Sequence, residues 1–139
     1  NTVMLGDSDQ MQKGSRFIWV NWSKALRAEW KGSKGGVIEF IGAIKAYDTI
    51  GNIRHNRRVA IDFSKREMIV EDSMEGEAGS LMRQIWHPTA DIKFSQPDSN
   101  CTIKKSKRYY SNTYGQNEEA NQIEFFTSGK KITTVLKYA

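Results

Sequence analysis

An antiparallel, two-sheet β-sandwich is the all-β fold that the sequence predicts, on the basis of three observations. Short runs of β-branched and aromatic residues recur along the chain and are broken at close intervals by Gly, Asn, Asp and Ser. The run at 57–63 alternates between polar and apolar side chains, as a half-buried strand does. The chain has two prolines in 139 residues, which fits a sheet protein because central strands exclude proline.

This alternating run and the segment after it predict a hairpin. Its apolar positions would share one face of the first strand, and a short turn would lead into a second strand with its own apolar positions inward. The predicted core residues of this hairpin are Val59, Ile61, Phe63, Met68 and Val70. The carboxylates that follow are interpreted as turn residues, because the spacing of a calcium loop is missing; they are Glu71, Asp72, Glu75 and Glu77.

Further strands are expected at 1–5, 37–44, 81–87, 92–94, 102–104, 123–127 and 132–137, with loops at 31–36 and 112–121. The region from Phe17 to Trp30 is ambiguous. Its first half has β composition, whereas Ser23 could cap the start of a helix. Strands are favoured here.

Composition predicts one domain over residues 1–139 and anionic partners. Apolar residues make up 38% of the chain, enough for a packed core, and no run approaches the roughly 18 to 20 apolar residues of a membrane span. The net charge is +5. Acidic polysaccharide, nucleic acid and anionic membrane all remain open as partners on charge alone. The single cysteine, Cys101, excludes an internal disulfide and is interpreted as a small buried hydrophobe.

The first candidate site is a basic run around His55. Arg54, Arg57 and Arg58 surround this histidine just before the alternating strand. Arginine forks match carboxylates and sulfates, and histidine can bind metal or move protons. The run is equally compatible with a solvated strand end whose charges prevent edge pairing.

A second basic stretch, 104–108, precedes Tyr109 and Tyr110. Cations beside aromatic rings suit acidic sugars and single-stranded nucleic acid alike, and a solvated strand with buried tyrosines fits as well. His87, before Pro88, is assigned a packing role. Only two histidines occur and no Gly-x-Ser-x-Gly motif is present, so the residues alone support no catalytic group in this chain.

The order of short motifs along nearly the whole chain resembles the C-terminal part of the heparinase II/III-like polysaccharide lyases. The motifs are an Asn-Thr-apolar strand with an acidic turn and Asp-Gln (1–10), Gly-x-x-Phe (14–17), a His-x-Arg strand start (55–57), an apolar strand with an acidic turn (69–76), Trp-His-Pro (86–88) and Tyr-Ser-x-x-Tyr-Gly (110–115). The sequence departs from the family pattern in two places. The family's Asp-Gly order appears here reversed, as Gly6-Asp7, and the histidine that the family has immediately before the position of Asn1 lies outside this sequence.

This resemblance implies a parent enzyme that cleaves uronate-containing acidic polysaccharide, such as heparan sulfate, by β-elimination. An upstream (α/α) toroid would supply the catalytic Tyr with Asn or His, and this domain would complete the cleft and support the toroid. The resemblance also implies that His55 is a candidate zinc ligand, that Arg54, Arg57, Arg58 and Tyr110 are candidate substrate contacts, and that the protein is bacterial and periplasmic or secreted. The isolated chain is expected to be inactive.

Two other functions stay open. An autonomous carbohydrate-binding module for anionic glycans would need its own aromatic platform, and a nucleic-acid binder, favoured by charge alone, lacks any known motif. Trp19, Trp22 and Trp30 fall within twelve residues, more bulky rings than a small sandwich core needs. We expect at least one to face another domain or a second copy, with the His55 cluster nearby.

Overall fold

The computed structural model describes residues 2–16, 18–32, 35–77, 79, 81–88, 92–95, 100–110 and 116–138, without the side chain of Tyr110. All regular structure in these ranges is β, which confirms the predicted fold class. The strands are β1 (Thr2–Leu5), β2 (Gln12–Lys13), β3 (Trp19–Val20), β4 (Lys24–Gly32), β5 (Val37–Ala46), β6 (Ile53–Asp62), β7 (Glu67–Glu75), β8 (Met82–Trp86), β9 (Lys93–Ser95), β10 (Thr102–Tyr110), β11 (Glu118–Thr127) and β12 (Lys131–Lys137). No helix of the length and hydropathy that a membrane crossing needs occurs in the described ranges.

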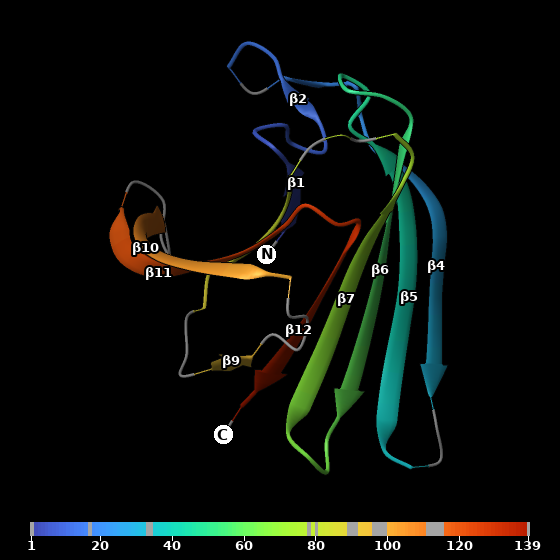
Figure 1. Ribbon diagram of the computed structural model, residues 1–139, viewed down its shortest axis with the longest axis vertical. Helices are drawn as coiled ribbons and strands as arrows, with labels where there is room; N and C mark the ends of the chain where they lie inside the picture. Colours follow the sequence, from blue (N-terminus) through green and yellow to red (C-terminus); the bar gives the residue numbers. More distant parts are fainter. Residues whose placement is uncertain are drawn as a thin grey trace.

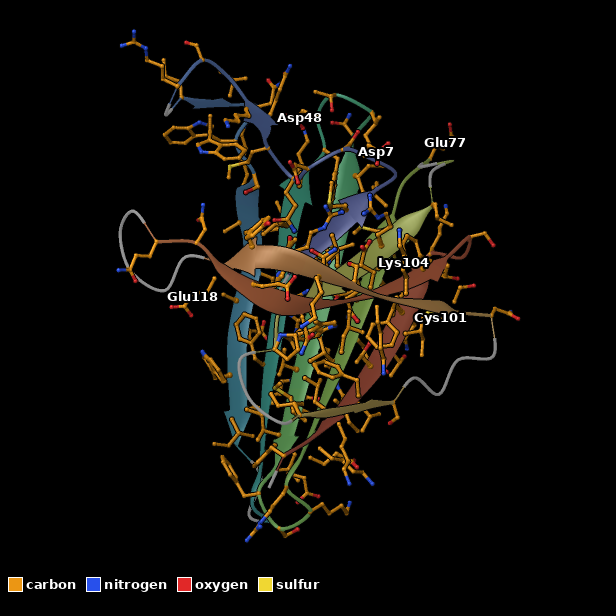
Figure 2. The ribbon with its side chains drawn as sticks, turned by 90° about the vertical axis from the view of Figure 1, so that its left-hand side faces the viewer. Asp7, Asp48, Glu77, Cys101, Lys104 and Glu118 are labelled. Atoms are coloured by element: carbon orange, nitrogen blue, oxygen red, sulfur yellow. The ribbon has the colours of Figure 1, made fainter. Side chains whose placement is uncertain are left out.

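Two antiparallel sheets pack on each other. The larger has the strand order β4-β5-β6-β7-β12-β9 and the smaller has the order β1-β8-β11-β10, while β2 and β3 form a separate ribbon. Figure 1 shows the long strands β4 to β7 of the larger sheet side by side, with β10 and β11 to their left and running in a different direction. Turned by 90°, the molecule shows β10 and β11 lying crosswise over one face of the larger sheet (Figure 2). This face is called the inner face below.

The core lies where the two sheets meet. Alternate residues of each strand point inward, so one side of each sheet is apolar. The smaller sheet contributes Val3, Leu5, Met82, Trp86, Ile123 and Phe125, and the larger contributes Ile53, Val70, Met74, Ile132 and Leu136. Cys101, interpreted from the sequence as a small buried hydrophobe, packs against this cluster but is only partly buried.

The predicted hairpin is strands β6 and β7, joined by residues 63–66. The Asp62 carboxylate accepts hydrogen bonds from the backbone N–H groups of Ser64 (3.0 Å) and Lys65 (3.1 Å), which fixes the turn. Phe63 is therefore the first turn residue and no longer follows the strand alternation. Its side chain is 56% exposed, so its assignment to the core was wrong.

The other four predicted core residues of the hairpin differ in depth. Val70 is 2% exposed and belongs to the core cluster. Val59 and Met68 are partly buried against that cluster, and Ile61 is of intermediate exposure. The core therefore lies towards the other end of the hairpin, away from its turn.

The ambiguous region is extended, as favoured. Asn21 has a φ of 55° between β3 and β4, and β4 pairs with β5 with a register shift between Ala25 and Arg27. No helix begins at Ser23. This register shift is a β-bulge, which inserts an extra residue into one strand.

Several boundaries differ from the predictions. β10 runs on to Tyr110, and β11 begins at Glu118, inside the loop expected at 112–121. These extensions pair with each other, with Lys107 close to Glu119 (3.6 Å), so charged residues form strand where composition alone indicated loop. Gly32 still belongs to β4, so the loop expected at 31–36 starts later; residues 33–34 and 111–115 lie outside the described ranges.

Candidate functional site

Strand β6 separates the basic run onto two faces. The run was expected just before the strand, but β6 already begins at Ile53. Alternation therefore places His55 and Arg57 on the inner face and Arg54 and Arg58 on the outer face. The three arginines do not form one anion-binding cluster.

The outer-face arginines make ion pairs with neighbouring strands. A guanidinium nitrogen of Arg54 lies 3.9 Å from Glu75, and both side chains are largely exposed. Arg58 bonds to Glu39 on β5 and to Glu71 on β7 (3.1 Å), and these two carboxylates raise its pKa, the Glu39 hydrogen bond most. Both arginines therefore have protein partners on a solvated face.

Asp72 is the centre of the inner-face site. Its side chain is fully buried and accepts hydrogen bonds from His55 Nε2 (2.7 Å), from Arg57 Nε (2.7 Å) and Nη2 (2.9 Å), and from Gln84 Nε2 (2.6 Å). Burial by itself would raise the pKa of this carboxyl. The hydrogen bonds from His55 and Arg57 outweigh it and hold the pKa at about 2. The interpretation of Asp72 as a turn residue was wrong, because it lies in the middle of β7.

The same network connects the two sheets. Gln84 lies on β8 of the smaller sheet, and its Oε1 accepts hydrogen bonds from Trp86 Nε1 (2.9 Å) and from the Thr134 hydroxyl on β12. A chain of polar contacts therefore runs through the core from β6 to β8. Buried polar groups with all partners in place favour one arrangement of the sheets.

The second ring nitrogen of His55 faces Gln10. Nδ1 lies 3.2 Å from the amide nitrogen of Gln10, which can donate but not accept. Nδ1 is therefore the acceptor, and the ring proton sits on Nε2, where it is donated to Asp72. Nearby, the buried hydroxyl of Tyr47 donates to the carbonyl of Val3 (2.8 Å), and burial raises the pKa of this phenol.

A groove of about 290 Å³ opens beside His55 on the inner face. Its polar lining comes from Gln10, Arg27, His55 and Arg57, and its apolar lining from Ala25, Ala28, Phe40, Gly42, Ala43 and Ile44. A Cβ on Gly42 would lie 2.8 Å from the Phe40 ring, so glycine is what lets this ring lie flat over β5. The groove is largely apolar, with hydrogen-bonding groups at a few points.

Three exposed tryptophans lie before and along β4. Trp19, Trp22 and Trp30 are 42%, 70% and 71% exposed, so all three lie outside the core, where at least one was expected to be exposed. The Trp30 ring contacts the ring of Phe40, with centroids 5.0 Å apart. Since Phe40 lines the groove together with His55, the expected nearness of this aromatic region to His55 is also confirmed.

A second polar row crosses the outer face of the smaller sheet. His87 Nε2 lies 2.9 Å from Gln122 Oε1, Gln122 donates to Glu124 (2.6 Å), and Arg83 bonds to both Glu124 (2.7 Å) and Asp7 (3.1 Å). Burial tends to raise the pKa of Glu124, but the bonds from Arg83 and Gln122 lower it overall. The His87 contact agrees with a packing role.

The second basic stretch lies on β10, an edge of the smaller sheet. Lys104, Lys105, Lys107 and Arg108 are exposed, and the Tyr109 side chain is 79% exposed. Lys104 is labelled on this strand in Figure 2. The predicted substrate contact Tyr110 lies at the end of the strand, and its side chain is outside the described part.

The described residues hold no group of three or more His, Cys, Asp or Glu side chains that could bind a metal ion. His55 has the features of a single ligand, because the residue lines the groove and Asp72 orients its ring through Nε2. A zinc ion at Nδ1 would need its other ligands from outside the described residues, and would displace Gln10.

The chain belongs to the family described as heparinase II/III-like, C-terminal, whose model matches residues 1–136. Among solved structures, it is similar to the heparan sulfate lyase HepC from Pedobacter heparinus, with 14% identity and a TM-score of 0.73, over 98% of this chain and 23% of that one. It is also similar to a heparinase III gene product, with 15% identity and a TM-score of 0.67, over 98% of this chain and 23% of that one. The chain thus spans less than a quarter of either enzyme. A comparison with curated proteins gave no match.

Proposed function

We propose that this domain is the C-terminal β-sandwich of a polysaccharide lyase that cleaves uronate-containing anionic polysaccharide by β-elimination. The family match and the fold shared with a heparan sulfate lyase support the class. The main observation behind the role proposed for this chain is the groove beside His55. It is the place on the inner face where a buried, oriented histidine meets an opening lined by aromatic and polar groups.

In this proposal the groove forms part of one wall of the substrate cleft. The Gln10 amide, which His55 orients through Nδ1, supplies hydrogen bonds to sugar hydroxyls, and the Trp30–Phe40 pair offers an apolar surface for a sugar face. The Arg57 charge is offset by Asp72, so the groove contributes hydrogen bonds and shape more than charge. The elimination removes the C5 proton of a uronate and expels the 4-linked sugar, and the base and acid come from an upstream domain.

The partners and setting follow from the same proposal. An upstream toroid and an acidic polysaccharide are the expected partners, and nucleic acid is not. Zinc, if the complete protein holds it, would bind Nδ1 of His55, and metal analysis of that protein with and without His55→Ala tests this. A periplasmic or secreted location in a bacterium is testable by fractionation of the source cells.

The experiment is a substrate panel with the complete natural protein. Heparan sulfate, alginate and a neutral polysaccharide are incubated with it, and the ultraviolet absorbance of unsaturated uronate products is followed. Product from a uronate polymer and none from the neutral one supports the proposal. Hydrolysis without unsaturated ends, or no reaction on any uronate polymer, contradicts it.

A second candidate function is autonomous binding of anionic glycans through β10. The specific observation is a nine-residue edge strand with four exposed cations next to an exposed Tyr109. Isothermal titration of the 139-residue chain with heparan sulfate separates the two functions. Binding that Lys105→Ser and Lys107→Ser weaken, without any elimination by the complete protein, favours the binding module.

A further inference from the structure

Strand β4 leaves one long side of the larger sheet unpaired. It bonds to β5, and no other described strand lies beyond it. Figure 1 shows it at the right-hand edge of the sheet. All nine of its residues, Lys24–Gly32, are exposed. An edge of this length presents a row of free backbone N–H and C=O groups to any strand that can pair with it.

The sequence of β4 is self-complementary around Ala28. In an antiparallel pair of two β4 strands related by a two-fold axis at Ala28, Arg27 of each copy lies opposite Glu29 of the other. Arg27 and Glu29 already share one face, where they form an exposed ion pair (2.6 Å). The pairing would join two such pairs into one group of four alternating charges, and opposite charges at facing positions stabilise a strand pair.

Neighbouring registers lack this complementarity. In an antiparallel pair, facing side chains point to the same side of the sheet. The two-fold axis between two copies of one strand must therefore pass beside a residue that faces its own copy. An axis at Arg27 puts two Arg27 side chains opposite each other. An axis at Glu29 opposes two Glu29 side chains and also sets Lys31 against Arg27. Of these three registers, the one at Ala28 pairs unlike charges. An axis at Trp30 would also do so, with Glu29 opposite Lys31, but it gives Arg27 no acidic partner, so Arg27→Glu distinguishes the two registers.

Apolar side chains extend the contact beyond the charges. Leu26 is 55% exposed and Trp30 is 71% exposed, and they occupy facing positions in the Ala28 register. Leu26 lies at the bulge, where pairing with β5 shifts register, so the regular part of the contact covers residues 27–29 of each copy. Large apolar groups that monomers leave exposed in this way commonly belong to an interface.

The other long edge, β10, is protected against such pairing. A two-fold pair centred on Ser106 would oppose Lys105 to Lys107 and Lys104 to Arg108, so every nearby charged pair would repel. Charged edges of this kind are a common device against strand pairing. β4 has a bulge near its start, but from Arg27 to Glu29 its charges would attract a second copy, in contrast to those of β10.

We propose that a second copy of this chain pairs with β4 about Ala28, joining two six-stranded sheets edge to edge. The contact is a symmetric, antiparallel strand pair between two identical chains. It does not rest on the lyase function, because the contact forms without substrate. It does share Arg27 with the lining of the groove and Trp30 with the apolar surface that the proposed function offers to a sugar.

The test is a set of charge exchanges in the complete natural protein, followed by sedimentation equilibrium. Arg27→Glu and Glu29→Arg each place like charges opposite each other, and each should raise the dimer Kd about tenfold. The double variant Arg27→Glu/Glu29→Arg restores unlike pairs and should restore the dimer. Mixing the two single variants should give a heterodimer, because each then faces its complement. Lys65→Glu, an exposed charge change in the β6–β7 turn, is the matched control and should not alter the Kd.

Three results would overturn the proposal. One is a wild-type protein that stays monomeric up to about 1 mM. Another is a dimer whose Kd is the same in both single variants. A third is a monomer in which the β4 amides are strongly protected from hydrogen exchange, since another part of the same protein would then cover this edge. Lyase activity can be present or absent in any of these cases, so the two proposals fail separately.

Discussion

Asp72 takes hydrogen bonds from three side chains and is itself fully buried, so its loss removes the negative charge that pairs with Arg57. We expect Asp72→Asn to lower the free energy of unfolding by about 3 to 5 kcal/mol, because Arg57 keeps its charge while losing its buried carboxylate partner. Urea denaturation measures this. Glu71→Gln, one residue earlier on the exposed face, is the control and should cost about 1 kcal/mol or less. Equal losses in both variants would contradict the central place of Asp72.

The lowered pKa of Asp72 also predicts a pH dependence. The folded carboxyl titrates at about 2, below its ordinary 3.8, so its contribution to stability is complete above about pH 4 and is lost as pH falls towards 2. At about 1.4 kcal/mol per pKa unit, this contribution is about 2 kcal/mol. Denaturant midpoints of the wild type should therefore fall faster below pH 4 than those of Asp72→Asn. Parallel curves would show that other carboxyls dominate.

The two faces of β6 make different predictions for substrate. If the groove is part of the cleft, Gln10→Ala should lower kcat/KM of the complete enzyme on its uronate polymer several-fold, about 1 kcal/mol of lost hydrogen bonding. Arg54→Ala, on the opposite face, should change it little. If Arg54→Ala lowers kcat/KM more than Gln10→Ala does, the substrate contacts lie on the outer face, and Arg54 and Arg58 contact substrate directly.

Hairpin β6–β7 offers a test at the scale of an element. Val70 is fully packed, whereas Phe63 begins the exposed turn. We expect Val70→Ala to destabilise by about 1 to 3 kcal/mol and Phe63→Ser by no more than about 0.5 kcal/mol. Chemical denaturation of both variants decides it. A large cost for Phe63→Ser would mean that this ring is covered in the complete protein.

The position of the buried site could have been derived from the hairpin. Once the turn is placed at 63–66, counting back in register sets Asp72 opposite Arg57, and Val70 and Met74 on either side of Asp72 mark its face as the buried one. The apolar alternation at 57–63 correctly gave the hairpin but placed the core at the wrong end. A capping carboxylate at Asp62 ends the strand there, and periodicity carries no information on such a cap.

At the scale of the whole molecule, the fold class, the hairpin and most strands were predictable from the sequence, because period-2 patterns and turn residues are local signals. Pairing between distant strands was not. The charged parts of β10 and β11 form strands because they pair with each other. Gln84, on the smaller sheet, reaches Asp72 across the core. Such contacts follow from packing, which a single sequence does not reveal.

The most direct test of the central claim compares the complete natural protein with the 139-residue chain on the same uronate polysaccharide. Circular dichroism first shows that the isolated chain is folded and β-rich. Formation of unsaturated uronate is then followed for both proteins at equal molar concentration. We expect product from the complete protein and none from the isolated chain, because in the proposed function this domain supplies part of the cleft wall and an upstream domain supplies the base and acid. Sustained elimination by the isolated chain, or none by the complete protein, would contradict it.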